Sequence, residues 1–321
     1  MAELRGAVIG YGLAGSVFHA PLIAATPGLM VSTVVTANAE RRAAASRAYP
    51  DSIVASDAED VFARAADHDF VVVAAPNDAH VALARNALDA GLPVVVDKPF
   101  APTADEAQSL VERAEELEVP ITAYMNRRWD SDQLTLQRLL EKQSLGEILR
   151  YESRLERWRP ALSDPRPWSE TSSPEAGGGI LLDLGSHLVD QATLLFGRPE
   201  RVYAELANHR GGGADDDAFV ALEHGPGVRS HLWTSLLAAS PGPRLRVLGD
   251  RAAYVVEDVD SQEEALVSGA RPGGEGDWGA EPREKWGHLI DEQGSEPVPS
   301  ERGDWPFLSS TSALAWCSTR N

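Results

Sequence analysis

Short apolar runs alternate with helix-prone segments along the first third of the chain. Strands are predicted at 4–9, 30–36, 70–75, 93–97 and 120–124. The runs FVVVAA (70–75) and PVVVD (93–97) are almost wholly apolar, which is typical of strands buried on both faces of a parallel sheet. Helices are predicted between the strands at 16–25, 39–48, 57–66, 79–90 and 103–118. This alternation predicts an α/β domain with a doubly wound parallel sheet over residues 1–123.

The period of the pattern changes in the rest of the chain. Residues 148–158 (ILRYESRLERW) alternate between apolar and polar, which indicates a strand with one solvent-exposed face. A helix is predicted at 180–196, followed by strands at 201–207, 219–223, 229–236, 244–248 and 252–257. The acidic, Gly- and Pro-rich stretch 268–303 is expected to be surface loop. Residues 124–321 are therefore predicted to form an α+β domain with a mostly antiparallel open sheet and helices on one side.

Composition excludes several classes of protein. The 321 residues carry a formal net charge of −20, which disfavours binding to nucleic acid or to an anionic membrane. Cys317 is the one cysteine, so the chain holds no internal disulfide or cysteine-based metal site. No apolar run approaches the length of a membrane span, and no signal-type segment opens the chain. We expect a soluble, cytoplasmic protein with no nucleic-acid or membrane partner.

A glycine-rich turn follows the first predicted strand and leads into the first predicted helix. It has the spacing Gly-x-Gly-x-x-Gly, and its members are Gly10, Tyr11, Gly12, Leu13, Ala14 and Gly15. In this strand–turn–helix context the pattern predicts a Rossmann dinucleotide site, with the pyrophosphate held at the start of the helix. A tight turn without a ligand is the alternative.

The end of the second strand bears on which dinucleotide would bind. Thr36 stands where an NAD-binding chain usually has an acid, and it is followed by Asn38 and Arg41. Without a carboxylate there, a 2′-phosphate is not repelled, and Arg41 can pair with it. NADP(H) is therefore favoured, and NAD(H) remains the alternative. In the alternative, Arg41 does not bind a phosphate and lies on a solvent-exposed helix face.

Two later strand ends carry polar residues at the edge where such sheets bind ligands. Pro76, Asn77 and His80 follow the strand 70–75, and we expect them beside a cofactor. A plain helix cap is the alternative. Lys98 follows the strand 93–97 and is also expected to bind the cofactor there. Its ammonium could act on a substrate oxygen or extend into water.

A third group of residues follows the glycine triplet at 177–179. Asp183 and His187 are four residues apart and share one face of the predicted helix. A carboxylate one turn away can orient an imidazole and raise its basicity, which suits a general base. A buried structural histidine, or half of a metal site, is the alternative; no further ligand cluster accompanies the pair, and we expect no metal.

These motifs together resemble those of the glucose–fructose oxidoreductase/inositol dehydrogenase (Gfo/Idh/MocA) family. The resemblance spans about 200 residues, although Asp97 stands before Lys98-Pro99 where the family more often has Glu. It is closest to the NADP-dependent scyllo-inositol dehydrogenase-like subgroup, in the segments FHAP (18–21) and NRRWDSD (126–132). The resemblance implies hydride transfer between a secondary alcohol and a nicotinamide. It makes His187 the proton acceptor, Lys98 a hydrogen-bond donor to the same oxygen and Asp183 an orienting carboxylate.

The resemblance also suggests a polyol or sugar as substrate and a homodimer or homotetramer formed through the open sheet. Four residues are expected to contact the substrate: Tyr124, Arg127, Trp129 and Trp158. Relatives usually continue past Gly-Asp-Trp (303–305) with further helices, so the C-terminus here is expected to be truncated or altered. Two other functions stay open at this point, a non-catalytic nucleotide-binding regulator and a biosynthetic keto-sugar reductase.

Overall fold

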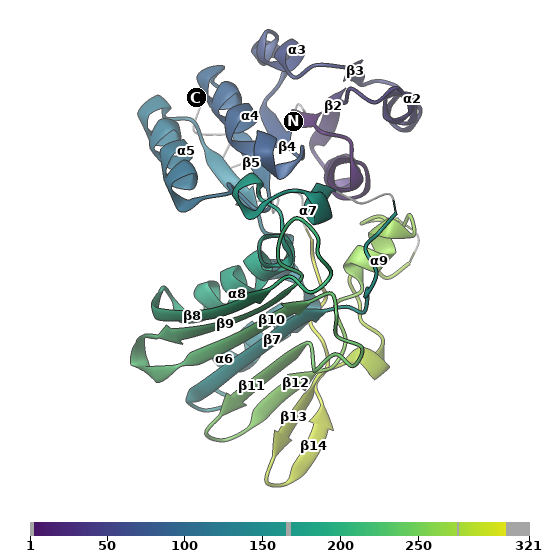
Figure 1. Cartoon of the computed structure of the whole chain (residues 1–321). Helices are drawn as coiled ribbons and strands as arrows, with labels where there is room; N and C mark the ends of the chain where they lie inside the picture. The colour runs from purple at the N-terminus through teal and green to yellow at the C-terminus, as the bar shows by residue number, and fades with distance from the viewer. Residues whose placement is uncertain (1–2, 165–167, 275, 306–321) are drawn as a thin grey trace. The chain divides into compact units, whose positions relative to one another are not determined.

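The computed structural model describes residues 3–164, 168–274 and 276–305 (Figure 1). The chain divides into two compact units, and each is described by itself. The described part of the first unit runs to Tyr124 and includes Glu264–Gly276, whereas the second consists of Met125–Glu263 and Asp277–Trp305. The return of residues 264–276 to the first unit was not predicted, since nothing in that polar segment distinguishes it from surface loop. The expected change at the C-terminus falls on residues 306–321, outside the described residues.

The first unit is built on a six-stranded, wholly parallel sheet with the order β3-β2-β1-β4-β5-β6. This is the doubly wound Rossmann order, so that prediction is confirmed. The strands are β1 (Leu4–Ile9), β2 (Leu29–Val35), β3 (Ile53–Ala55), β4 (Phe70–Val73), β5 (Val94–Asp97) and β6 (Ile121–Tyr124). The helices are α1 (Ala20–Ala25), α2 (Ala39–Ala48), α3 (Glu59–Phe62), α4 (Asn77–Asp89) and α5 (Ala104–Leu117), with a π-helical turn at Ala14–His19.

The central strands of this sheet form the core of the first unit. Every residue of β4 is fully buried, as are the three valines of β5. The helix predicted at 57–66 is wrong in detail: α3 is one turn long, and a separate 3₁₀ turn follows at Ala65–Asp67. Arg64 leaves helical geometry between them (φ −118°, ψ 34°), where the chain turns back toward β4. The short strand β3 was not predicted, because its three residues carry little periodic signal.

The second unit is built on an eight-stranded sheet with the order β14-β13-β12-β11-β7-β10-β9-β8. All pairings are antiparallel except that of β7 with β10, which confirms a mostly antiparallel sheet. The strands are β7 (Ile148–Glu156), β8 (Pro199–Ala207), β9 (Asp217–His224), β10 (Arg229–Ser235), β11 (Leu245–Gly249), β12 (Ala253–Val256), β13 (His288–Asp291) and β14 (Gly294–Pro297). The helices are α6 (Ser131–Glu141), α7 (Trp168–Thr171) and α8 (Ser186–Phe196). The helix α9 (Gln262–Val267) begins in this unit and ends in the segment assigned to the first unit.

One face of the second sheet packs on α6 and α8. The core there joins Leu136 and Leu139 of α6 and Leu188 of α8 to inward-facing residues of β7, β10 and β11. The prediction that 268–303 is loop is wrong, because β13 and β14 form a hairpin within it. Nearly all of its residues are exposed, so the segment lacks the apolar alternation by which a half-buried strand is recognised. The helix α6 was also not predicted.

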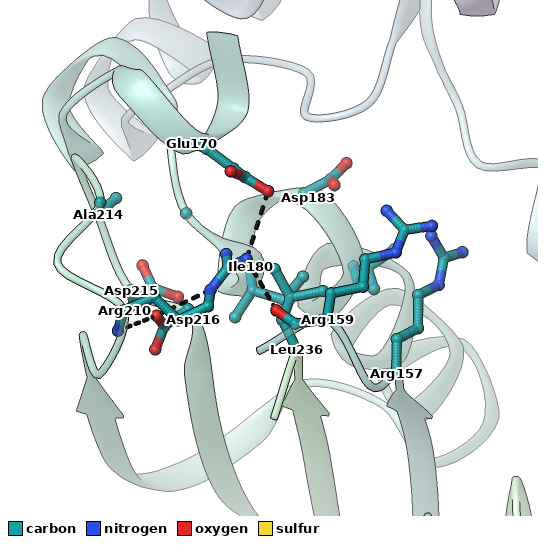
Figure 2. Close-up of a pocket in the computed structure, with 13 residues that line it drawn as sticks. Arg157, Arg159, Glu170, Ile180, Asp183, Arg210, Ala214, Asp215, Asp216 and Leu236 are labelled. Carbon is teal, nitrogen blue, oxygen red and sulfur yellow. Dashed lines mark hydrogen bonds and ion pairs between the residues drawn. The ribbon is translucent and has the colours of Figure 1, made fainter. Parts of the chain in front are cut away.

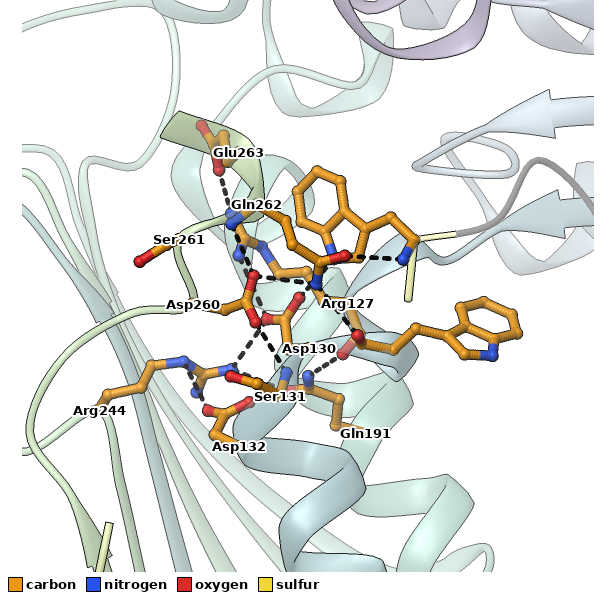
Figure 3. Close-up of polar contacts among 12 residues, drawn as sticks. Arg127, Asp130, Ser131, Asp132, Gln191, Arg244, Asp260, Ser261, Gln262 and Glu263 are labelled. Atoms are coloured by element: carbon orange, nitrogen blue, oxygen red, sulfur yellow. Dashed lines mark hydrogen bonds and ion pairs between the residues drawn. The ribbon is translucent and has the colours of Figure 1, made fainter. Parts of the chain in front are cut away.

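A buried polar network ties the segment before α6 to distant parts of the second unit (Figure 3). Asp130 accepts a hydrogen bond from the indole N–H of Trp305 at 2.7 Å and pairs with Arg127 at 3.3 Å. Burial, with the nearby Asp260 and Asp132, raises the pKa of Asp130 well above its usual range, and Arg127 and Arg244 oppose this shift. The network fixes the conformation of residues 126–132, which include the 3₁₀ turn at Asn126–Trp129 and the start of α6.

Within the described ranges, no helix is both long and apolar enough to cross a bilayer.

Candidate active site

The glycine-rich turn has the geometry of a phosphate cradle. Gly10 has a φ of +103°, and a Cβ there would lie 2.3 Å from the carbonyl oxygen of Ala74, so only glycine fits beside β4. At Gly12, in contrast, the nearest atom to an added Cβ is the Nη1 of Arg41, at 3.8 Å. The backbone at Gly12 therefore faces open space bordered by a guanidinium. A pyrophosphate-bearing ligand fits this surface.

The three polar residues expected after β2 have different roles. The side chain of Asn38 accepts a hydrogen bond from the backbone N–H of Arg41 at 2.9 Å and so caps α2. Thr36 is buried, and its carbonyl accepts from the guanidinium of Arg42. Arg41 is exposed, and among the described residues its guanidinium has no hydrogen bond or ion pair. Arg41 is thus the one of the three whose side chain remains available beside the glycine-rich turn.

The residues after β4 divide between surface and interior. Pro76 is exposed at the strand end, and Asn77 is buried at the start of α4. His80 is buried, with Nδ1 2.9 Å from the carbonyl oxygen of Pro99 and Nε2 2.9 Å from that of Ala75. Both ring nitrogens of His80 therefore lie beside backbone carbonyls of the protein. Its ring joins the end of β4 to the turn after Lys98 and supports that turn.

Lys98 directly follows β5, as expected. Its backbone N–H donates to Oδ1 of Asp97 at 2.8 Å, and Oδ2 of Asp97 lies 3.5 Å from Nε2 of the buried His19. Burial favours a raised pKa for Asp97, but His19, Lys98 and His80 outweigh it and hold the pKa below its ordinary value. A charged carboxylate is therefore held directly beside the candidate catalytic lysine.

Tyr124 packs against this cluster. Its ring centroid lies 4.5 Å from that of His19, and 8% of the residue is exposed. Burial, and then the nearby Asp97, raise the pKa of the Tyr124 phenol. The residue was expected to contact substrate; the structure places its ring in the packing behind Lys98.

Arg271 lies near Tyr11 of the glycine-rich turn and was not predicted to do so. It belongs to the segment that returns to the first unit. Its charge lowers the pKa of Tyr11 and Tyr49, against the larger effect of burial, which raises both. No local motif marks it, because its proximity to Tyr11 depends on the path of residues 264–276.

The helical segment that carries Asp183 and His187 starts as a π-helical turn (Leu181–Gly185) and continues as α8. Irregular turns of this kind are frequent at functional sites. Gly179 has a φ of +102°, and a Cβ there would lie 2.1 Å from a carboxylate oxygen of Asp215. This close approach lets Asp215 accept a hydrogen bond from the backbone N–H of Leu181 at 2.8 Å. Asp215 thereby satisfies one of the free N–H groups at the start of the segment.

Asp183 lines a pocket of the second unit (Figure 2). His187, which is 3% exposed, lies one turn further along the same segment and is not among the residues that line the pocket. Arg210 pairs there with Glu170 at 3.4 Å and with Asp216 at 3.2 Å. Burial tends to raise the pKa of Glu170, but hydrogen bonds from Ser163 and the charge of Arg210 lower it below its ordinary value. The pocket is lined by Arg157, Arg159, Glu170, Gly179, Ile180, Asp183, Leu184, Arg210, Gly212, Ala214, Asp215, Asp216 and Leu236.

The other residues expected to contact substrate lie elsewhere in the second unit. Arg127, which was expected to contact substrate, is 3% exposed and is bound in the buried network to Asp130 and Glu263. Trp129 is partly buried, and its carbonyl accepts from Gln262. Trp158 is 56% exposed but does not line the pocket, because alternation along the extended chain gives those positions to Arg157 and Arg159. Sequence reasoning also missed Glu170, Arg210 and Asp215.

No group of three or more His, Cys, Asp or Glu side chains is placed to hold a metal ion in the described part of the chain.

Comparisons with known proteins agree with this architecture. The profile described as "Oxidoreductase family, NAD-binding Rossmann fold" matches residues 4–125, and that of the GFO/IDH/MocA C-terminal domain matches residues 133–255. The chain is 41% identical over 296 residues to the uncharacterized oxidoreductase YdgJ of Escherichia coli, covering 92% of this chain and 82% of that one.

A sequence match and a solved structure, both from Bacillus subtilis, extend the comparison. The chain is 33% identical over 307 residues to the scyllo-inositol 2-dehydrogenase (NADP(+)) IolW, covering 94% of this chain and 83% of that one. It is also similar to the solved structure of the YvaA protein, with a TM-score of 0.88 and 30% identity, covering 99% of this chain and 89% of that one.

Proposed function

Because the chain belongs to the Gfo/Idh/MocA family and is an NAD(P)-dependent dehydrogenase, we propose that it acts on a secondary alcohol of a polyol or sugar. The observation that carries this proposal is the pocket lined by Asp183, with His187 on the same capped helical segment. A relative named as a scyllo-inositol 2-dehydrogenase supports the substrate class.

We propose NADP(H) as the cofactor, with NAD(H) as the alternative. The backbone at Gly12 is open, and Arg41 borders it with a guanidinium that can pair with a 2′-phosphate. No carboxylate occupies position 36, where it would bind ribose hydroxyls and repel that phosphate. The relative IolW is named for NADP(+), which supports the same choice. The backbone of residues 10–15 would hold the pyrophosphate, with Pro76 and Asn77 at the neighbouring strand end.

Three side chains would perform the chemistry. The bound nicotinamide supplies or accepts the hydride. His187 takes the hydroxyl proton as the alcohol is oxidised, and Lys98 donates a hydrogen bond to the same oxygen. Asp183, one turn before His187, holds the imidazole or a neighbouring substrate hydroxyl in place. In the reverse direction His187 returns the proton to the carbonyl oxygen.

Copies of the chain are proposed to associate through the open face of the second sheet. Aromatic rings run across three strands there: Tyr203 lies 6.5 Å from Phe219, and Phe219 lies 5.1 Å from Trp233. Tyr203 is 58% exposed, and a contiguous group of exposed apolar side chains often marks an interface between proteins. Light scattering of wild type and Trp233→Glu should show a dimer or tetramer that the substitution weakens; an unchanged monomer in both would remove this proposal.

The function is tested by following NADPH and NADH formation with a panel of polyols and sugars. Wild type should reduce NADP with at least one of them. The variants Lys98→Ala and His187→Ala should lose about 10²–10⁴-fold in kcat because each removes a group that acts on the transferring proton or its oxygen. His187→Ala should still bind NADPH, as measured by the fluorescence of the nucleotide. Binding without turnover of any alcohol or ketone would refute the dehydrogenase proposal, and full activity in both variants would refute the assigned roles.

A further inference from the structure

We infer that the substrate carries an anionic group, a carboxylate or a phosphate ester, that is bound by Arg157 and Arg159. This inference rests on the proposed function and narrows its substrate class from neutral polyols and sugars to sugar acids or sugar phosphates.

Arg157 and Arg159 follow β7, and the backbone there is extended and paired. The N–H of Arg157 donates to the carbonyl of Ser235 at 2.8 Å, and the N–H of Arg159 donates to that of Leu236 at 2.7 Å. Trp158 between them forms an isolated bridge with Leu237. Because side chains alternate along such a segment, Arg157 and Arg159 point to one side. Figure 2 shows their guanidinium groups next to each other in the pocket that Asp183 lines.

The other charges that line the pocket already have partners in the protein. Arg210 is neutralised by Glu170 and Asp216. Asp215 accepts the backbone N–H of Leu181, and burial raises its pKa. Because Arg210 is paired with two carboxylates, Arg157 and Arg159 supply the positive charge in this pocket that is available to a ligand.

Few acidic groups of the protein neutralise the charges of these two arginines. Arg157 approaches Glu263 at 3.5 Å, but Glu263 is also bound by the buried Arg127. The guanidinium of Arg159 makes no hydrogen bond or ion pair with any residue that the structure describes. Two neighbouring guanidiniums repel each other unless an anion lies between or before them. Their planar donor groups match the paired oxygens of a carboxylate or phosphate better than a single neutral hydroxyl.

The first test compares charged and neutral alcohols of similar size in steady-state turnover. D-Gluconate and D-glucose 6-phosphate are set against D-glucose and scyllo-inositol, with wild type, Arg157→Gln, Arg159→Gln and the control Arg198→Gln. Arg198 is an exposed arginine of the same unit that does not line the pocket. Wild type should prefer an anion, and each pocket variant should raise its KM by about 10- to 100-fold with a smaller change in kcat. KM for the neutral alcohols, and all values for Arg198→Gln, should stay unchanged.

The second test measures binding without turnover. Its result can be read even if the protein oxidises none of the alcohols tested. Calorimetry of the NADPH-loaded protein with gluconate and with glucose 6-phosphate should show binding that weakens in Arg159→Gln and with added salt, but not in Arg198→Gln. The stronger of the two probes identifies carboxylate or phosphate as the preferred anion. Turnover of scyllo-inositol with unchanged constants in both pocket variants, and no anion binding, would overturn this inference while leaving the dehydrogenase proposal in place.

Discussion

Asp215 accepts a hydrogen bond from the backbone N–H of Leu181 at 2.8 Å, across the close approach that Gly179 permits. This bond joins the loop before β9 to the start of the segment that carries Asp183 and His187. Asp215→Ala should lower the free energy of unfolding by about 1 kcal/mol, as for loss of a helix cap, and should lower kcat by displacing the two candidate catalytic side chains. Thermal unfolding and steady-state kinetics measure the two effects.

The matched control is Asp215→Asn, which keeps an oxygen acceptor for Leu181. It should retain most of the stability and activity that the alanine variant loses. Equal losses in both variants would mean that the charge of Asp215, and not its hydrogen bond, is what the site needs.

Arg41 should decide the choice of cofactor. Its guanidinium borders Gly12 and is free of protein partners within the described residues, so Arg41→Ala removes a group available to a 2′-phosphate. We expect KM for NADP to rise about tenfold or more while KM for NAD changes little, since NAD has no phosphate there. Kinetics with both cofactors measure the ratio.

Arg47→Ala serves as the control for that substitution, since Arg47 is an exposed arginine in the last turn of the same helix, α2. It should leave both KM values as they are. A parallel rise for NAD and NADP in Arg41→Ala would instead show that Arg41 supports the turn and does not read the phosphate.

Trp305 should stabilise the second unit through its indole N–H. That group donates to Oδ1 of the fully buried Asp130 at 2.7 Å. Trp305→Phe leaves the carboxylate without this donor, so the free energy of unfolding should fall by about 1–3 kcal/mol. Chemical denaturation is the measurement. In the half-buried Trp286, the indole N–H donates to the carbonyl of Glu281. The control Trp286→Phe should therefore lower the free energy of unfolding by less than Trp305→Phe does.

The pair of Arg5 and Asp69 should make stability depend on acid pH. Asp69 accepts bonds from the backbone N–H of Arg5 at 2.7 Å and from its side chain at 3.1 Å. These bonds and the charge of Arg5 outweigh burial and hold the pKa of Asp69 below its usual value. The stabilisation is therefore complete above the unfolded pKa of about 3.9 and is lost as pH falls through the lower folded pKa.

Asp69→Asn removes this titration. Its unfolding free energy should be about 0.5–1 kcal/mol below that of wild type above pH 5, because the pair is partly exposed. The gap should close as pH falls below about 4. A gap that stays constant across this range in thermal unfolding would show that the Asp69 charge does not supply the difference.

The sequence by itself determined the Rossmann sheet and the positions of its motifs. Local rules suffice there: a short all-apolar run such as 70–75, followed by Pro76, predicts a buried strand, and Gly10 lies where the turn after the first strand needs a positive φ. Lys98, Asp183 and His187 were predicted as site residues for the same reason, since each stands at a strand end or a helical spacing that the pattern reveals. The exposed hairpin of β13 and β14 gave no such signal, because its residues meet solvent on both faces.

Only the tertiary structure decided what the neighbouring polar side chains do. Arg127 and His80 look like ligand contacts in sequence, yet Arg127 is bound to Asp130 and Glu263, and His80 joins the carbonyls of Ala75 and Pro99. Arg157 and Arg159, in contrast, line the pocket because the extended chain after β7 turns them away from Trp158. Such assignments depend on partners far away in the chain. A charged side chain is available to a ligand only when the fold has not already given it a counter-charge.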